Sequence, residues 1–261
     1  MIRRILAMGG GGFTTAERSP ALDRHVLELP DVPVPRICFL PTASGDPREQ
    51  VTRFLGRFGD WPCEPSTLSL FHLGRDRIDP VAHLATQDVI YVGGGSMRNL
   101  LAIWREHGID RVLEQAWRRG TVLAGLSAGA MCWFAGGVSK SGGAPEVAPG
   151  MGLLDGSLSV HMDGEPERLP VYLGAVAGGE LPGGWAADDG AALVFEGRRL
   201  ARCVGSHGAA RVLSVRSDGR GGTTCRDLPV EVLPQAADDG PAVDAGVAEL
   251  RALRAGRRRW G

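Results

Sequence analysis

One serine of this 261-residue chain stands in a context typical of an attacking hydroxyl. Ser127 is the centre of Gly125-Leu126-Ser127-Ala128-Gly129, between the short apolar runs 121–124 and 130–134. This order predicts a strand, a sharp turn and a helix, with the hydroxyl pushed clear of the backbone and the glycines letting strand and helix approach. The N–H of Ala128 would then face a developing oxyanion. Because the chain holds 39 glycines, it can also match GxSxG by chance. The alternative is therefore a glycine-rich turn whose serine only caps a helix.

A serine nucleophile needs a base, and His161 is the best-placed histidine. It ends the apolar stretch 158–161 and opens an acidic segment. Because adjacent parallel strands end on one edge of a sheet, this imidazole is expected to reach Ser127. His207 would be the base in an α/β-hydrolase, whose histidine comes late in the chain, but it falls in an expected hairpin turn.

A second glycine turn, Gly93-Gly94-Gly95, follows the apolar run 88–92. Three glycines allow backbone N–H groups to point outward and bind an anion. Neither this turn nor Gly9–Gly12 has the GxGxxG or GK[ST] pattern of a nucleotide-phosphate loop. We therefore expect Gly94 and Gly95 to complete an oxyanion hole with Ala128.

The elements that position these residues alternate along the first half of the chain. Apolar runs at 5–8, 36–40, 66–71, 88–92 and 122–124 are interspersed with helical patterns at 50–58, 97–106 and 109–119. Continuous apolar runs are typical of parallel strands buried on both faces. The sequence thus predicts an α/β fold, a doubly wound, mostly parallel sheet with helices on both faces and ligands at the strands' carboxyl ends.

The second half is less regular. Residues 136–152 are rich in Gly, Ser and Pro and predict a surface loop, followed by a short strand at 158–161 and a helix at 168–177. Three runs, at 191–195, 200–204 and 211–215, predict a closing antiparallel region. We expect residues 1–235 to form a single catalytic domain, and residues 236–261 a polar linker and a basic tail.

Composition excludes several classes of protein. The chain has 29 basic and 30 acidic residues, which gives no electrostatic case for nucleic acid or an anionic membrane as a partner. Its five cysteines form no CxxC pair, so neither disulfides nor a zinc site is indicated, and we expect no metal or cofactor. The apolar runs are too short for a membrane span or a signal peptide, which favours a cytoplasmic protein.

The three motifs together resemble the peptidase E family of aspartyl dipeptidases and cyanophycinase-like enzymes, which is related to class I glutamine amidotransferases. The likeness covers residues 1–215 and includes Cys38–Ser44, His161 in its His-x-Asp-Gly-Glu context, and both glycine turns. It implies a class I glutamine amidotransferase-like fold and a homodimer. It also implies hydrolysis of short peptides after an N-terminal aspartate, through an acyl-enzyme and without metal. Carried over by motif, Ser127 is the nucleophile, His161 the base, and Gly94, Gly95 and Ala128 the oxyanion donors.

Two positions depart from that family pattern. Ser96 follows the triple glycine where many members have Asn, and Val138-Ser139-Lys140-Ser141 has a lysine where Val-Thr-Asp-Ser would supply the third acid. A carboxylate is needed to orient the imidazole and stabilise its cation. We predict that Glu146 supplies it, with Asp163 the weaker candidate because it is so close to His161 in sequence. A Ser–Lys dyad that uses Lys140 is a further alternative.

The substrate that the resemblance implies is a small peptide such as an Asp-X dipeptide. Its charges need partners, and we expect Arg168 to bind a carboxylate and Glu165 the amine. The alternative for both residues is a solvated helix start. A catalytically degenerate member that binds a small peptide or acidic metabolite is the rival function, favoured by Lys140. An esterase of the α/β-hydrolase type is disfavoured by the short interval from Ser127 to His161.

Overall fold

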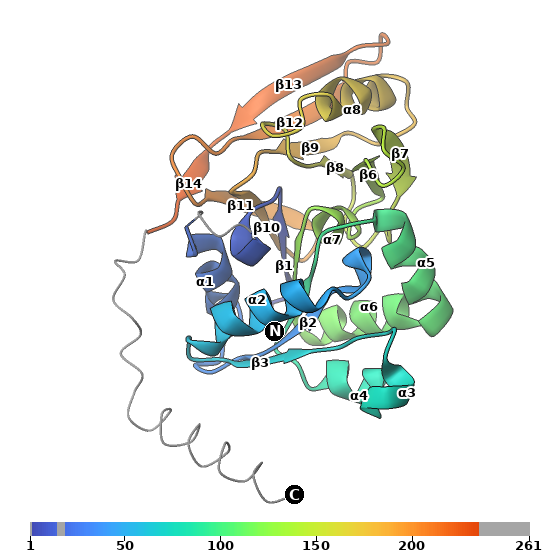
Figure 1. Ribbon diagram of the computed structural model, residues 1–261. Coiled ribbons are helices and arrows are strands. Elements are labelled where there is room, and N and C mark those ends of the chain that lie inside the picture. The colour runs from blue at the N-terminus through green and yellow to red at the C-terminus, as the bar shows by residue number, and fades with distance from the viewer. Residues whose placement is uncertain (1, 15–18, 235–261) are drawn as a thin grey trace, which may run out of the picture.

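The computed structural model describes residues 2–14 and 19–234 (Figure 1). The expected polar linker and basic tail at 236–261 lie outside the described residues, so that prediction stays open. The chain forms two sheets, one of eight strands and one of six. Among the described residues no helix is both long and apolar enough to cross a bilayer.

The eight-stranded sheet has the order β14-β11-β10-β1-β5-β4-β2-β3. Five neighbouring strands run parallel to one another: β1 (Arg4–Met8), β5 (Val122–Leu126), β4 (Val89–Val92), β2 (Arg36–Leu40) and β3 (Glu64–Thr67). On the other side of β1, β10 (Ala191–Glu196) and β11 (Arg199–Gly205) are antiparallel, and β14 (Val230–Val232) is parallel to β11. The predicted mostly parallel sheet is confirmed, although β3 ends four residues earlier than expected.

Helices cover both faces of this sheet, as predicted. Alternate residues of each strand point to opposite faces, so that in β1 Leu6 and Met8 enter one core while Ile5 and Ala7 enter the other. The first core is covered by α1 (Ala21–Glu28) and α2 (Arg48–Gly59). The second core is covered by α4 (Pro80–Ala85), α5 (Met97–His107), α6 (Ile109–Arg119) and α7 (Ala128–Met131). Shorter turns of helix are η1 (Gly12–Thr14), η2 (Thr42–Ser44) and α3 (Leu73–Asp76).

The six-stranded sheet was not predicted. Its order is β13-β12-β9-β8-β6-β7. The strands are β6 (Gly136–Ser139), β7 (Glu146–Pro149), β8 (Ser157–Ser159), β9 (Gly184–Ala187), β12 (Val212–Ser217) and β13 (Thr223–Leu228). One face packs on the second core of the first sheet, and the other is covered by α8 (Arg168–Ala177) (Figure 1).

Two expectations about the second half are therefore wrong. The surface loop at 136–152 contains an antiparallel hairpin, β6 with β7, because its glycines serve close packing: a Cβ on Gly137 would lie 2.3 Å from the carbonyl oxygen of Leu158. The three-stranded closing region is divided, since β12 pairs with β9 and β13 in the second sheet. The helix expected at 168–177 is confirmed as α8.

A buried carboxylate in the first core makes stability depend on pH. Asp23 is fully buried in α1 and accepts a hydrogen bond from the Tyr91 hydroxyl at 3.2 Å. Burial raises the pKa of Asp23 to about 7, against the attraction of Arg57 and the hydrogen bond from Tyr91, which lower it. The unfolded chain, with an ordinary aspartate pKa of ~3.9, loses this proton between about pH 4 and 7 while the folded chain keeps it. Stability therefore falls as pH rises through that window.

Asp23→Asn should remove this dependence, because an amide does not titrate and its oxygen can still accept from Tyr91. We expect the free energy of unfolding of the variant, relative to the parent, to rise by about 2–4 kcal/mol between pH 4.5 and 7.5. Urea unfolding at both pH values measures it. A difference that is the same at both pH values would contradict the raised pKa of Asp23.

Candidate active site

Ser127 lies on a sharp turn between β5 and α7. Its backbone has φ 53° and ψ −116°, the left-handed half of the map that residues with a side chain rarely adopt. The turn is held on both sides, since the Ser127 N–H donates to the Met8 carbonyl at 3.1 Å and the Ser127 carbonyl accepts from Ala130 and Met131. Such a turn directs the side chain away from the strand.

The glycines at both ends of this turn are required by close contacts. A Cβ on Gly125 would lie 2.1 Å from the carbonyl oxygen of Gly129, and one on Gly129 would lie 2.4 Å from that of Val92. Strand β5, helix α7 and strand β4 therefore approach to backbone contact at these positions. The GxSxG spacing follows from this packing.

His161 reaches Ser127 from the other sheet. It follows β8 with φ 55°, and its Nε2 lies 2.8 Å from Ser127 Oγ. The two side chains approach each other as expected. The strands that precede them, β5 and β8, however, belong to different sheets. In Figure 1 α7, which follows Ser127, lies between the two sheets. The Ser127–His161 contact bridges the two layers.

The carboxylate on the far side of the imidazole is Asp189, which sequence reasoning missed. Its Oδ1 lies 2.5 Å from His161 Nδ1. Because a carboxylate only accepts, Nδ1 carries the proton and Nε2 is left to accept from the serine hydroxyl. Asp189 lies in the turn that connects β9 to β10 and thus the second sheet to the first. The signal that was available is Asp188-Asp189-Gly190 directly after an apolar run.

The glycine loop after β1 makes room for this pair. A Cβ on Gly10 would lie 2.0 Å from Asp189 Oδ1 and 2.6 Å from His161 Cε1. The same loop holds the neighbouring turns, because the Gly10 carbonyl accepts from the N–H of Gly190 at 3.1 Å. In the segment Gly9–Gly12, which matches no phosphate-binding motif, it is Gly10 that lies against the histidine and the aspartate.

Two of the three expected oxyanion donors lie beside the serine side chain. Ala128 follows Ser127 directly, and a Cβ on Gly94 would lie 3.2 Å from Ser127 Cβ. Gly95 packs against η2 instead, where its Cβ would lie 2.3 Å from the Ala43 carbonyl oxygen. Within residues 2–14 and 19–234 none of the three N–H groups has a hydrogen-bond partner. Gly94 and Ala128 are thus available to a substrate oxygen beside Ser127.

The structure does not place Glu146, the predicted third acid, beside His161. Glu146 begins β7, and its Oε1 forms an ion pair with Arg98 Nε of α5 at 3.0 Å. The imidazole nitrogen that it was expected to bind is occupied by Asp189. The interval from His161 to Asp189 hides this contact in the sequence, because the connecting residues form α8 and β9.

Lys140 forms ion pairs with two carboxylates of the segment that follows His161. Its Nζ lies 2.5 Å from Glu167 Oε1 and 3.4 Å from Glu165 Oε2. The hydrogen bond with Glu167, assisted by the charges of both glutamates, raises the pKa of Lys140. Ser127 Oγ is hydrogen-bonded to His161, and Lys140 contacts glutamates instead of the serine. These contacts do not support a Ser–Lys dyad.

Glu146→Gln is accordingly expected to change kcat by less than about twofold, and stability by less than about 1 kcal/mol, because it removes only an exposed ion pair. Peptide hydrolysis and thermal unfolding measure both. Lys140→Asp should not raise activity, since it puts a third negative charge beside Glu165 and Glu167. A steep loss of rate in Glu146→Gln would restore Glu146 as the acid.

The two residues expected to bind substrate are occupied within the protein. Arg168 is only 5% exposed, and its guanidinium donates to Glu165 Oε2 at 2.6 Å and to the Val138 carbonyl at 2.7 Å. It thereby ties the start of α8 to β6. Glu165 also contacts Lys140. These contacts correct the expectation: the charges of Arg168 and Glu165 are satisfied without a substrate.

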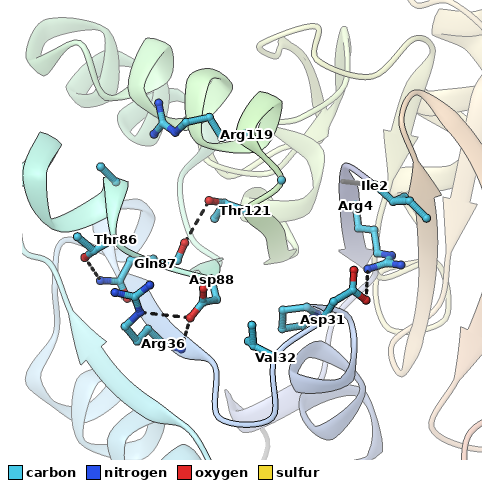
Figure 2. A pocket seen from close by; sticks show the side chains of 13 residues that line it. Ile2, Arg4, Asp31, Val32, Arg36, Thr86, Gln87, Asp88, Arg119 and Thr121 are labelled. Carbon is cyan, nitrogen blue, oxygen red and sulfur yellow. Dashed lines mark hydrogen bonds and ion pairs between the residues drawn. The ribbon is translucent and has the colours of Figure 1, made fainter.

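A pocket of about 420 Å³ lies at the opposite end of the first sheet (Figure 2). It is lined by Arg4 and Arg36, the first residues of β1 and β2, whereas Ser127 follows the last residue of β5. Two of its lining arginines are paired with lining aspartates, Arg36 with Asp88 at 3.3 Å and Arg4 with Asp31 at 3.4 Å. This pocket is separate from the serine and histidine.

Comparisons with known proteins relate the chain to peptidases. Residues 5–203 match the model of peptidase family S51. The chain is 45% identical over 214 residues to an uncharacterized peptidase, YgaJ, of Bacillus subtilis (strain 168), with 82% of this chain and 92% of that protein covered. It is 29% identical over 201 residues to peptidase E of Streptomyces coelicolor (strain ATCC BAA-471 / A3(2) / M145), covering 70% and 80%.

A solved structure shares the fold. The crystal structure of a peptidase from an acI-B1 Actinobacterium superposes with a TM-score of 0.63 at 19% identity. The likeness covers 88% of this chain and 95% of that one.

Proposed function

Because the chain belongs to peptidase family S51, we propose that this peptidase is of the serine type and cleaves small peptides, Asp-X dipeptides among them, through an acyl-enzyme. The observation that carries the proposal is the continuous hydrogen-bonded series Ser127 Oγ, His161 and Asp189. Serine hydrolases of unrelated folds use this arrangement of hydroxyl, imidazole and carboxylate.

The first half-reaction forms the acyl-enzyme. Ser127 Oγ attacks the scissile carbonyl carbon while His161 Nε2 takes the hydroxyl proton. Asp189 stabilises the imidazolium and keeps the proton on Nδ1. The N–H groups of Ala128 and Gly94 donate to the carbonyl oxygen as it becomes an oxyanion. When the C–N bond breaks, His161 gives the proton to the leaving amine.

The second half-reaction restores the enzyme. Water attacks the ester carbonyl, and His161 Nε2 takes a proton from it. Collapse of the second tetrahedral intermediate breaks the bond to Ser127 Oγ, which regains its proton from His161. The product is the carboxylic acid of the residue that preceded the cleaved bond.

The contacts of His161 weaken the alternative that the chain is a catalytically degenerate binding protein. That alternative depended on Lys140 in place of an acid, and Asp189 now fills the position beside Nδ1. The preference for an N-terminal aspartate rests on the relationship to peptidase E, since Arg168 and Lys140 are both paired with carboxylates. The same relationship favours a homodimer, which light scattering of the purified protein would test. The cytoplasmic location expected from the sequence stays a prediction.

Two assays test the proposed function. A serine-reactive phosphonate should label the protein once per chain, and mass spectrometry should find the label on Ser127. A panel of Asp-X dipeptides, other dipeptides and N-acetylated dipeptides should then give hydrolysis of free dipeptides. Absence of both labelling and hydrolysis would refute the serine mechanism.

A further inference from the structure

A second aspartate supports the turn that carries Asp189. Three hydrogen bonds join the segment after β8 to the end of β9 and the turn that follows it. His161 Nδ1 donates to Asp189 Oδ1, the Met162 N–H donates to the Ala187 carbonyl at 3.1 Å, and the Asp189 N–H donates to Asp163 Oδ1 at 2.8 Å. The last of these uses a side chain from outside the serine, histidine and aspartate series.

This contact fixes the backbone from which the acid projects. Asp189 is held on its two sides by main-chain bonds, from the Ala191 N–H to the Asp188 carbonyl at 3.2 Å and from the Gly190 N–H to the Gly10 carbonyl. The N–H of Asp189 itself is bonded by the carboxylate of Asp163. The segment that carries the base therefore also holds the acid, so the two cannot shift independently.

Asp163 adds a negative charge close to Asp188 and Asp189. Burial is the main cause that raises the pKa of the Asp188 carboxyl, and the charges of Asp163 and Asp189 raise it further, while Arg211 lowers it. A neutral asparagine would accept the same hydrogen bond without this repulsion. The hydrogen bond from the Asp189 N–H to Asp163 Oδ1, and not the charge of Asp163, is therefore the contact that reaches Asp189.

We propose that Asp163 is a positioning residue that orients Asp189 toward His161 Nδ1, and so acts on catalysis through Asp189 alone. This inference rests on the proposed serine mechanism. Hydrogen-bonding partners one step removed from the reacting groups fix ring and carboxylate orientation, and preorganised sites lose rate when that support is removed.

The test is a set of variants measured for kcat, KM and the rate of phosphonate labelling. Asp163→Ala should lower kcat and the labelling rate by about tenfold with KM nearly unchanged. Asp163→Asn should restore the rate to within about threefold of the parent, since Oδ1 is kept. In an Asp189→Ala background, Asp163→Ala should change kcat by less than about twofold, because the residue through which it acts is absent.

Asp218 supplies a matched control. It accepts from the N–H groups of Arg220 at 2.7 Å and Gly222 at 2.9 Å, in the turn between β12 and β13. Asp218→Ala therefore removes a comparable carboxylate-to-backbone contact away from Ser127, and should lower the melting temperature without lowering kcat.

Three results would overturn the inference. They are an Asp163→Ala variant that behaves like Asp218→Ala, an Asp163→Asn variant as slow as Asp163→Ala, and a full tenfold loss on adding Asp163→Ala to Asp189→Ala. A parent that is neither labelled nor hydrolytic would overturn the proposed function and this inference with it. A labelled parent with an indifferent Asp163→Ala would overturn the inference alone.

Discussion

Ser127→Ala is expected to lower kcat/KM for dipeptide hydrolysis by about 10⁴-fold or more and to abolish phosphonate labelling. The reason is that in the proposed mechanism Oγ, held 2.8 Å from His161 Nε2, is the attacking atom. Steady-state kinetics and intact-mass spectrometry measure the two effects. His161→Ala should cost nearly as much, and the double variant little more than either single variant, because nucleophile and base act as a unit.

A second replacement separates lost chemistry from lost structure. At φ 53° an alanine is strained whereas a glycine is not, so Ser127→Gly should be more stable than Ser127→Ala by about 1 kcal/mol. Both should be equally inactive. Ser214→Ala, a partly buried serine in β12, is the control that should keep full activity. Hydrolysis by either Ser127 variant would mean that another group is the nucleophile.

The first half of the fold could be predicted because its elements have strong local signals. Strands β4 and β5 are buried on both faces and have no polar residue at every second position. Such continuous apolar runs indicate buried parallel strands. Helices α5 and α6 end at glycines with positive φ, Gly108 and Gly120, which are ordinary helix stops. The nucleophile turn was equally visible, since Gly125 and Gly129 are imposed by backbone contact.

The second sheet was not predicted as a sheet, although strands were expected at 158–161 and 211–215. Four of its six strands have only three or four residues: β6, β7, β8 and β9. β6 reads Gly-Gly-Val-Ser and β8 has three residues, so neither shows a hydrophobic period. Their stability comes from packing between the first sheet and α8, which is a tertiary effect. The composition that predicts a loop is here the composition that lets strands approach closely.

The charged residues were the least predictable part of the site. Sequence gives the sign of Arg168 and Glu146 but not their partners, and both are paired within the protein. Asp189 was missed for the converse reason. Asp188-Asp189-Gly190 indicates a turn but not a partner, and Asp189 meets His161 because β9 connects to β10 beside the imidazole.

Asp189→Asn is the second large effect that we expect, a loss in kcat of about 10³- to 10⁴-fold with KM changed far less. The amide can present its NH₂ group to His161 Nδ1, which favours the tautomer with the proton on Nε2. That tautomer cannot accept the proton of Ser127 Oγ. The amide also leaves the imidazolium of the transition state without a neighbouring negative charge. Steady-state kinetics on the best dipeptide of the panel measures the loss.

The same change should leave the fold intact, because asparagine has the shape of aspartate and the N–H bonded by Asp163 is retained. The melting temperature of Asp189→Asn should therefore stay within a few degrees of the parent. Glu146→Gln is the matched control, since it makes the same chemical change at an acid that does not contact the imidazole.

A steep loss at Asp189 and none at Glu146 would establish a catalytic acid that comes from the crossover between the sheets. Ser127 is carried by the first sheet, His161 by the second and Asp189 by the segment that joins them. Catalysis then depends on how the two layers pack. The reverse pattern would return the acid to the β6–β7 hairpin and require that hairpin to move toward His161 during turnover.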